Sequence, residues 1–163
     1  ANNFKWNTSK GEDAYRRVMY TFFKRTSPYP NLISFDCPDS NTSRLQRDIS
    51  NTPLQALVTL NNRVFVEASQ ALTQRVLDKG GETDHEKLSY AMQKVLVRHP
   101  SENEIQRFKD LLTSSREYYA TNPEDAAKAT SIHRSASHSI EENAAWVATL
   151  RMLTNLDEFI VRD

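Results

Sequence analysis

The sequence predicts an all-α fold, an irregular array of about five to seven helices with a long ordered loop near residues 26–52. Apolar residues recur at the spacing of one helix face in successive segments, and several of these segments begin with a capping signal. Glycine is scarce, with 3 residues where average usage gives about 11. No run alternates apolar and polar residues for long enough to require a sheet.

The first predicted helix runs from residue 12 to residue 25. Its end is expected before Pro28, because a proline disfavours helical conformation at the residue that precedes it. The apolar residues follow the i, i+3, i+4, i+7, i+8 spacing of an amphipathic helix. They are Tyr15, Val18, Met19, Phe22 and Phe23.

Residues 26–52 show no sustained period and are rich in proline, serine, asparagine and aspartate, so we expect a long loop. Leu32, Ile33 and Phe35 indicate that the loop is pinned to the core. Irregular loops of this length are uncommon in compact domains and are often functional. The loop is therefore the first place to look for a binding site, and its candidate polar residues are Arg25, Asp36, Asp39, Arg47, Asn51 and Gln55.

A helical stretch is predicted from residue 53 to Gly80. Thr52 is a capping residue, and Pro53 stands at the first helical position, where its missing N–H costs nothing. Asn61-Asn62 falls in the middle and splits the stretch into two helices in one interpretation. The expected apolar stripe consists of Leu54, Leu57, Val58, Val64, Phe65, Ala68, Leu72 and Val76.

Two further helices are predicted on either side of Pro100. The earlier one spans residues 84–98, and the later one opens at Ser101, which forms a capping box with Glu104. The later helix ends at Asn122, and a short helical piece follows near residue 126.

The last predicted helix follows a polar loop at residues 130–139. Ser139 and Glu142 have the spacing of a second capping box. The apolar face of the helix carries Ile140, Trp146, Val147, Leu150 and Leu153.

Length and composition indicate a single helical domain over residues 1–163, with residues 1–10 as a tail or linker. The chain begins Ala-Asn-Asn without an initiator methionine, so we expect a fragment of a larger protein, and it contains no targeting signal or transmembrane segment. The 21 basic and 21 acidic residues balance, which argues against a nucleic-acid partner.

Most catalytic and metal-binding constellations are missing from the sequence. The four histidines lack the spacing of a zinc site, and a single cysteine, Cys37, excludes an internal disulfide and a C-x-x-C-H haem motif. We therefore expect no catalytic residue, no metal site and no cofactor within this chain. Asp36 and Asp39 read either as paired carboxylates or, more simply, as turn residues around a proline.

Asp157 and Glu158 follow the apolar face of the last helix, where negative charge opposes the helix dipole. Two explanations remain open from the sequence. Either the helix ends by Asn155, or the carboxylates pair with a cation, for which the candidates are Arg16, Arg17 and Arg47.

Four blocks of the chain carry a family resemblance, and they extend from about Tyr15 to Arg162. The blocks are YRRVMYTFFKRTSPYPNLISFDCPD, SNTPLQALVTLNNRVFVEASQAL, LVRHPSENE and AAWVATLRMLTNLDEFIVR. They resemble the planctomycete-specific C-terminal domain of unknown function found in large cytochrome-c-containing planctomycete proteins. The resemblance implies an exported parent protein, at the periplasm or cell surface, whose haem c lies in another domain. It supplies no catalytic residues.

Two functions from different classes fit these observations. The first is a non-catalytic helical module that packs against or positions the upstream domains of its parent, and under this hypothesis the isolated domain is not an enzyme. The alternative is a ligand-binding or enzymatic domain with its site in the 26–52 loop, and a small ligand or glycan would suit the arginines there.

Overall fold

The computed structural model describes residues 7, 9, 11–24, 26–38, 41–43, 45–46 and 50–161. The described part of the chain is all-helical, which confirms the predicted fold class. It contains eight α-helices, slightly more than the five to seven expected, together with two short 3₁₀ helices. The chain divides into two compact units, residues 1–48 and residues 49–163, and each is described by itself.

The first unit contains two 3₁₀ helices, Gly11–Tyr15 and Val18–Tyr20, and the short helix α1, Pro30–Ser34. The long helix predicted over residues 12–25 is therefore wrong. Tyr15, Met19 and Phe22 are each more than 60% exposed. Because most helical stability in proteins comes from packing an apolar face, a periodic stripe without a core to cover it does not maintain an α-helix.

Helix α1 also corrects the prediction of an irregular loop across residues 26–52. Its first residue is Pro30, which is preorganised for the first helical turn. The helix is five residues long, so Leu32 and Ile33, which were expected to pin a loop, lie in a short helix, and Phe35 is its C-cap.

The second unit contains seven of the α-helices. They are α2 (Pro53–Asn61), α3 (Arg63–Lys79), α4 (Asp84–Leu96), α5 (Glu102–Thr121), α6 (Pro123–Ala129), α7 (Ile140–Leu153) and α8 (Asp157–Ile160). The split at Asn61-Asn62, the short helix after Asn122 and the loop at residues 130–139 are confirmed. Among the described residues, no helix has the length and apolar character needed to cross a membrane.

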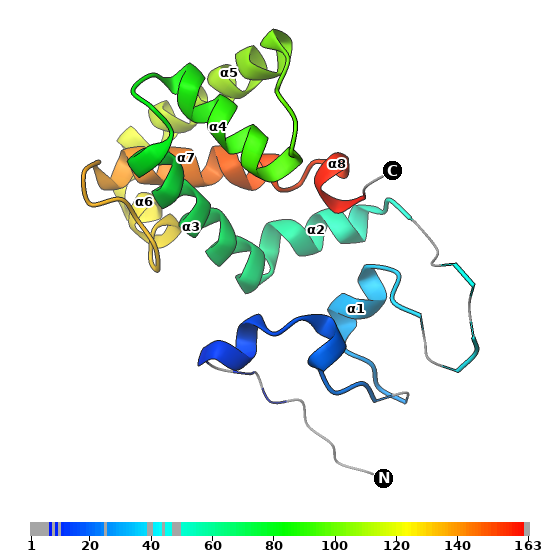
Figure 1. Ribbon diagram of the computed structural model, residues 1–163. Helices are drawn as coiled ribbons and strands as arrows, with labels where there is room; N and C mark the ends of the chain where they lie inside the picture. Colours follow the sequence, from blue (N-terminus) through cyan, green and yellow to red (C-terminus); the bar gives the residue numbers. More distant parts are fainter. Residues whose placement is uncertain are drawn as a thin grey trace. The chain divides into compact units, whose positions relative to one another are not determined.

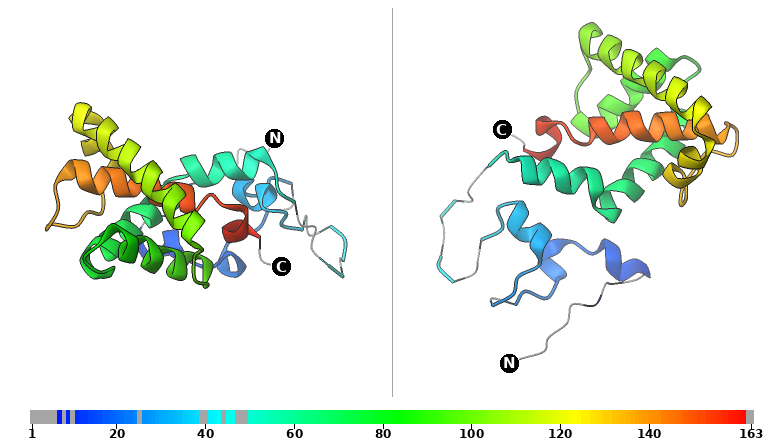
Figure 2. Two further views of the ribbon diagram at one scale, coloured as in Figure 1. Left: turned by 90° about the horizontal axis from the view of Figure 1, so that it is seen from above. Right: turned by 180° about the vertical axis from the view of Figure 1, so that it is seen from behind.

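Helix α7 runs through the middle of the second unit, with α3, α5 and α6 packed along it (Figure 1). Figure 2 shows from two further sides how α5 lies across α7. Since α7 has neighbours on several sides, its buried residues extend around the helix instead of forming one stripe. The core cluster consists of Val76, Leu77, Leu88, Ala91, Met92, Ile105, Leu112, Ala145, Trp146, Leu150 and Leu153.

Local sequence signals define most helix starts in this unit. Thr52 caps α2 as expected and also forms a capping box with Gln55, and Ser101 forms the expected capping box with Glu104. Thr83 forms a third box with Glu86 at the start of α4. Each box satisfies backbone N–H groups that have no partner within the helix, so the ends of these helices are fixed before any tertiary contact is made.

Candidate functional site

The candidate residues predicted from the sequence fall on different parts of the chain. Arg25, Asp39 and Arg47 lie outside the described residues. Asp36 belongs to the first unit, and Asn51 and Gln55 belong to the second.

Asp36 closes helix α1. Its φ angle is +56°, in the left-handed region, which aspartate tolerates better than most residues. The Asp36 N–H donates to the carbonyl of Ile33 at 3.1 Å, and the Cys37 N–H donates to the carbonyl of Leu32 at 2.9 Å. This pair of bonds is a Schellman motif, so the backbone of Asp36 lies in the turn that ends α1.

Gln55 is buried and works as a capping residue. Its amide oxygen accepts the N–H of Thr52 at 3.1 Å, and its amide nitrogen donates to the hydroxyl of Ser50 at 3.0 Å. The backbone N–H of Gln55 in turn donates to the Thr52 hydroxyl at 3.3 Å. The side chain therefore supports the start of α2, whereas its neighbour Asn51 is exposed.

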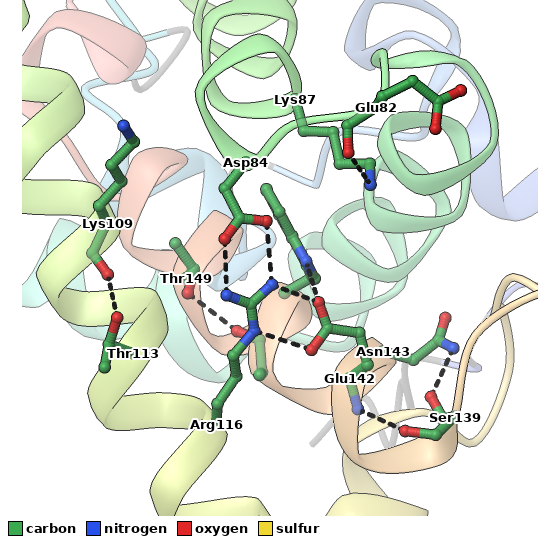
Figure 3. A network of polar contacts seen from close by, with 12 residues as sticks. Glu82, Asp84, Lys87, Lys109, Thr113, Arg116, Ser139, Glu142, Asn143 and Thr149 are labelled. Carbon is green, nitrogen blue, oxygen red and sulfur yellow. Dashed lines mark hydrogen bonds and ion pairs between the residues drawn. The ribbon is translucent and has the colours of Figure 1, made fainter.

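The most extensive polar network of the second unit surrounds Arg116 of α5 (Figure 3). The guanidinium donates to both carboxylate oxygens of Asp84, at 2.6 and 2.9 Å, and to both of Glu142, at 2.8 and 2.5 Å. The indole N–H of Trp146 donates to the same Glu142 carboxylate at 2.8 Å. One arginine thus joins the starts of α4 and α7 to the body of α5.

The charges of this network stabilise one another. Hydrogen bonds from Arg116 hold the pKa of Asp84 below its ordinary value of 3.8. Burial acts to raise the pKa of Glu142, but the bonds from Arg116 and Trp146 outweigh it, so the pKa lies below 4.5. Bonds to Glu142 and then Asp84 raise the pKa of the guanidinium. Both carboxylates stay ionised at neutral pH with their oxygens occupied, which suits a structural ion pair better than a general acid or base.

The network also changes a helix cap. Ser139 caps α7 as expected, because its hydroxyl accepts the N–H of Glu142 at 3.1 Å. Glu142 does not complete the predicted box, since its carboxylate turns to Arg116 and Trp146 instead. The prediction of a full capping box at residue 139 is therefore wrong.

A second arginine, Arg98, makes a similar bridge after α4. Its guanidinium donates to both carboxylate oxygens of Glu158 at 2.6 and 2.7 Å and to both of Glu104 at 2.6 and 3.1 Å. The bonds from Arg98, followed by those from Ser101, hold the pKa of Glu104 at about 2. Bonds from Arg98 likewise lower the pKa of Glu158.

This bridge answers the question raised by the charges at Asp157 and Glu158. Helix α7 ends at Leu153. Asp157 and Glu158 lie in the first turn of the next helix, α8, where negative charge interacts favourably with the helix dipole. Glu158 also has a cation, although that cation is Arg98 and not one of the three arginines expected from the sequence.

The loop at residues 130–139 gathers serine, histidine and aspartate side chains. The Ser135 hydroxyl donates to Asp78 at 2.6 Å, and the hydroxyl of Ser137 lies 3.0 Å from Nδ1 of His138. In a hydrolase triad the carboxylate binds one ring nitrogen of the histidine, and the other ring nitrogen binds the serine hydroxyl. Here the acid binds a serine directly, and that serine is 1% exposed, so the cluster fastens the loop to α3.

Asn143 fastens the other side of the same loop. Its amide oxygen accepts the N–H of Ser135 at 2.8 Å, and its amide nitrogen donates to the carbonyls of Ser135, His138 and Ser139. A fully buried asparagine with these partners holds an irregular segment that has no backbone ladder of its own. No group of three metal-ligating side chains occurs in the part of the chain that the structure describes.

Sequence reasoning missed Arg116 and its partners, although one signal was available. Arg116 lies four residues after Leu112, on the apolar face of α5. An arginine on the buried stripe of a helix requires a partner, because an unpaired charge there is costly. The pattern indicates the need for a carboxylate but does not say which helix provides it.

A comparison with known protein families finds a match for this chain. The family model described as PSD1, Protein of unknown function (DUF1553), matches residues 1–112. The matched segment contains the first unit and the second unit as far as Leu112 in α5. Neither a curated protein nor a solved structure matches the chain.

Proposed function

The chain belongs to the family described as Protein of unknown function (DUF1553), and from that premise we propose a non-catalytic role for it. It is a helical module of a larger exported, cytochrome-c-containing protein, in which it packs against upstream domains and positions them. The haem c of that parent is held elsewhere, because this chain has no C-x-x-C-H motif.

The observation that carries the proposal is an exposed apolar surface on α2 and the start of α3. Leu54, Leu57 and Val64 are 56%, 57% and 47% exposed. Isolated exposed leucines are ordinary, but several large apolar side chains close together in one segment are typical of a surface that another protein covers. Upstream domains of the parent are the occupant that the family resemblance favours.

The charged side chains support the non-catalytic part of the proposal. In the described residues, the carboxylates of Asp84 and Glu142 are bound by Arg116, and those of Glu104 and Glu158 are bound by Arg98. Lowered pKa values mark catalytic groups in some proteins and structural ion pairs in others. Arginine pairing between helices favours the structural role for these four.

The test is a calorimetric titration of this chain with the separately purified upstream part of its parent. We expect saturable binding, and we expect the double variant Leu54→Gln, Leu57→Gln to weaken it at least tenfold. This corresponds to about 1.4 kcal/mol, the range of interface residues that matter. Ile132→Gln is the matched control, because Ile132 is also large, apolar and 47% exposed but lies in the 130–139 loop.

Two results would overturn the proposal. One is the absence of binding at high micromolar concentration, and the other is binding that the α2 variants do not weaken more than the Ile132 control. If the chain instead binds a glycan or turns over a substrate, and Asp36→Ala abolishes this activity, the alternative of a ligand-binding or enzymatic loop takes its place.

A further inference from the structure

Helix α2 buries polar side chains and exposes apolar ones. Gln55 and Thr59 are buried at 1% and 3% exposure, while the exposed face carries Leu54 and Leu57. A surface helix usually turns its apolar stripe toward the core, and burial of that stripe is what holds it in place. Helix α2 therefore turns its two most exposed apolar side chains away from the core, and its fully buried side chains are polar.

Two hydrogen bonds, which we call the polar anchors, connect α2 to Arg151 of α7 and to Asn155 after it. The Thr59 hydroxyl donates to the side-chain oxygen of Asn155, and the Arg151 guanidinium donates to the backbone carbonyl of Leu60. That carbonyl is one of the last four of α2, which have no partner within the helix. Such bonds contribute little net stability, because water replaces them when the contact opens.

Two buried side-chain polar atoms among the described residues have no hydrogen-bond partner. Nε of Arg151 and the hydroxyl of Thr73 are buried without a hydrogen-bond partner. On α3, one turn before Thr73, the Ser69 hydroxyl lies 3.4 Å from that of Thr154, near the limit for a hydrogen bond. A buried group without a partner regains water when a contact opens, so Nε of Arg151 favours opening of the contact that Arg151 makes with Leu60.

The first turn of α2 and the start of α3 are capped without help from α7. Thr52 and Gln55 cap its first turn reciprocally. At the other end Asn62 is extended, with φ −72° and ψ 134°, and its side chain accepts the N–H of Val64 at 2.9 Å to begin α3 independently. Figure 1 shows that α2 and α3 meet at an angle, and Asn62 is the residue between them in the chain. Opening at Asn62 therefore leaves the cap of α3 in place.

From these observations we propose that α2 is a hinged arm, which separates from α7 at Asn62 and unfolds locally while the rest of the second unit stays folded. Opening exposes Thr59, Leu60 and Arg151 to water. This motion is separate from the docking role proposed above, because it takes place in the free chain and requires no partner.

Native-state hydrogen exchange on the whole 163-residue chain tests the arm. We expect the amides of residues 57–61 to open at least 100-fold more often than those of residues 145–153, a gap of about 2.7 kcal/mol. Their exchange should also depend only weakly on denaturant, because a local opening exposes little surface. Equal protection and equal denaturant dependence in α2 and α7 would overturn the proposal.

A pair of substitutions tests whether polar anchoring is the cause. Thr59→Val with Asn155→Leu replaces both partners of one anchor by apolar groups, which we expect to slow α2 exchange at least fivefold. Thr149→Val is the control, because the Thr149 hydroxyl is equally buried but bonds within α7, to the carbonyl of Ala145 at 2.8 Å. An unchanged α2 rate in the double variant would contradict polar anchoring. If that variant does not fold, the denaturant dependence of amide exchange in the wild-type chain tests the proposal by itself.

Discussion

At the scale of single residues, two arginines hold the second unit together. Arg116 gathers carboxylates from α4 and α7, and Arg98 gathers carboxylates from α5 and α8. A guanidinium suits this role because its planar fork binds carboxylates through two parallel hydrogen bonds. A lysine at either position would keep the charge but lose this geometry.

Val97 is the residue with the clearest backbone strain. It follows α4 with a φ of +59°, a conformation that β-branched residues rarely adopt, and its side chain is 70% exposed. Its N–H still closes the helix on the carbonyl of Gln93 at 3.1 Å. The strain allows the chain to turn so that the next residue, Arg98, reaches Glu104 and Glu158.

Replacement of Val97 by glycine should relieve this strain. We expect Val97→Gly to raise the free energy of unfolding by about 1 kcal/mol, because glycine adopts the left-handed conformation without a Cβ clash. Denaturant unfolding followed by circular dichroism measures the change. Lys94→Gly, at an exposed helical position of the same α4, is the control and should lower the free energy by about 1 kcal/mol. Equal destabilisation by both variants would refute the argument.

At the scale of elements, residues close in sequence determine where a helix starts, whereas packing against other elements determines which of its faces is buried. Thr52-Pro53 and the Ser101–Glu104 spacing predict helix starts correctly, because caps involve residues three apart. The apolar stripe of α2 predicts burial of Leu54 and Leu57, yet both are exposed. The periodicity of a stripe shows that a helix is amphipathic, but the side on which the core lies depends on the other elements.

Two leucines test this difference between pattern and packing. Leu150 and Leu57 both lie on predicted apolar stripes, but Leu150 is 0% exposed and Leu57 is 57% exposed. We expect Leu150→Ala to lower the free energy of unfolding by about 3 kcal/mol through lost burial and a cavity. Leu57→Ala should change it by less than about 0.5 kcal/mol. Comparable losses in denaturant unfolding would show that Leu57 is part of the core.

At the scale of the whole molecule, the ion pairs make stability depend on pH. The pKa values of Asp84, Glu104, Glu142 and Glu158 lie below their ordinary values of 3.8 or 4.5 when the protein is folded. Their contribution is complete above the pKa of the unfolded chain, and it disappears as pH falls through the lower pKa of the folded chain. Glu104, with a pKa of about 2, keeps part of its contribution far into acid.

The free energy of unfolding should therefore fall steadily between about pH 5 and pH 2. Urea titrations at successive pH values measure this slope, and Glu142→Gln should make it shallower by removing one of the carboxylates that Arg116 binds. Glu117→Gln is the control, since Glu117 is an exposed glutamate on the same helix as Arg116. A flat profile in the wild-type chain, or equal slopes in the two variants, would contradict the structural role of the network.

The sequence by itself determined the all-helical class, most helix boundaries in the second unit, and the capping residues that begin its helices. These features depend on contacts between residues a few positions apart, and the printed order of residues contains them. The tertiary structure decided the central place of α7, the outward turn of the apolar face of α2, and the diversion of Glu142 from its cap to Arg116. These depend on contacts between residues far apart in the chain, such as Arg98 with Glu158, for which no local pattern specifies a partner.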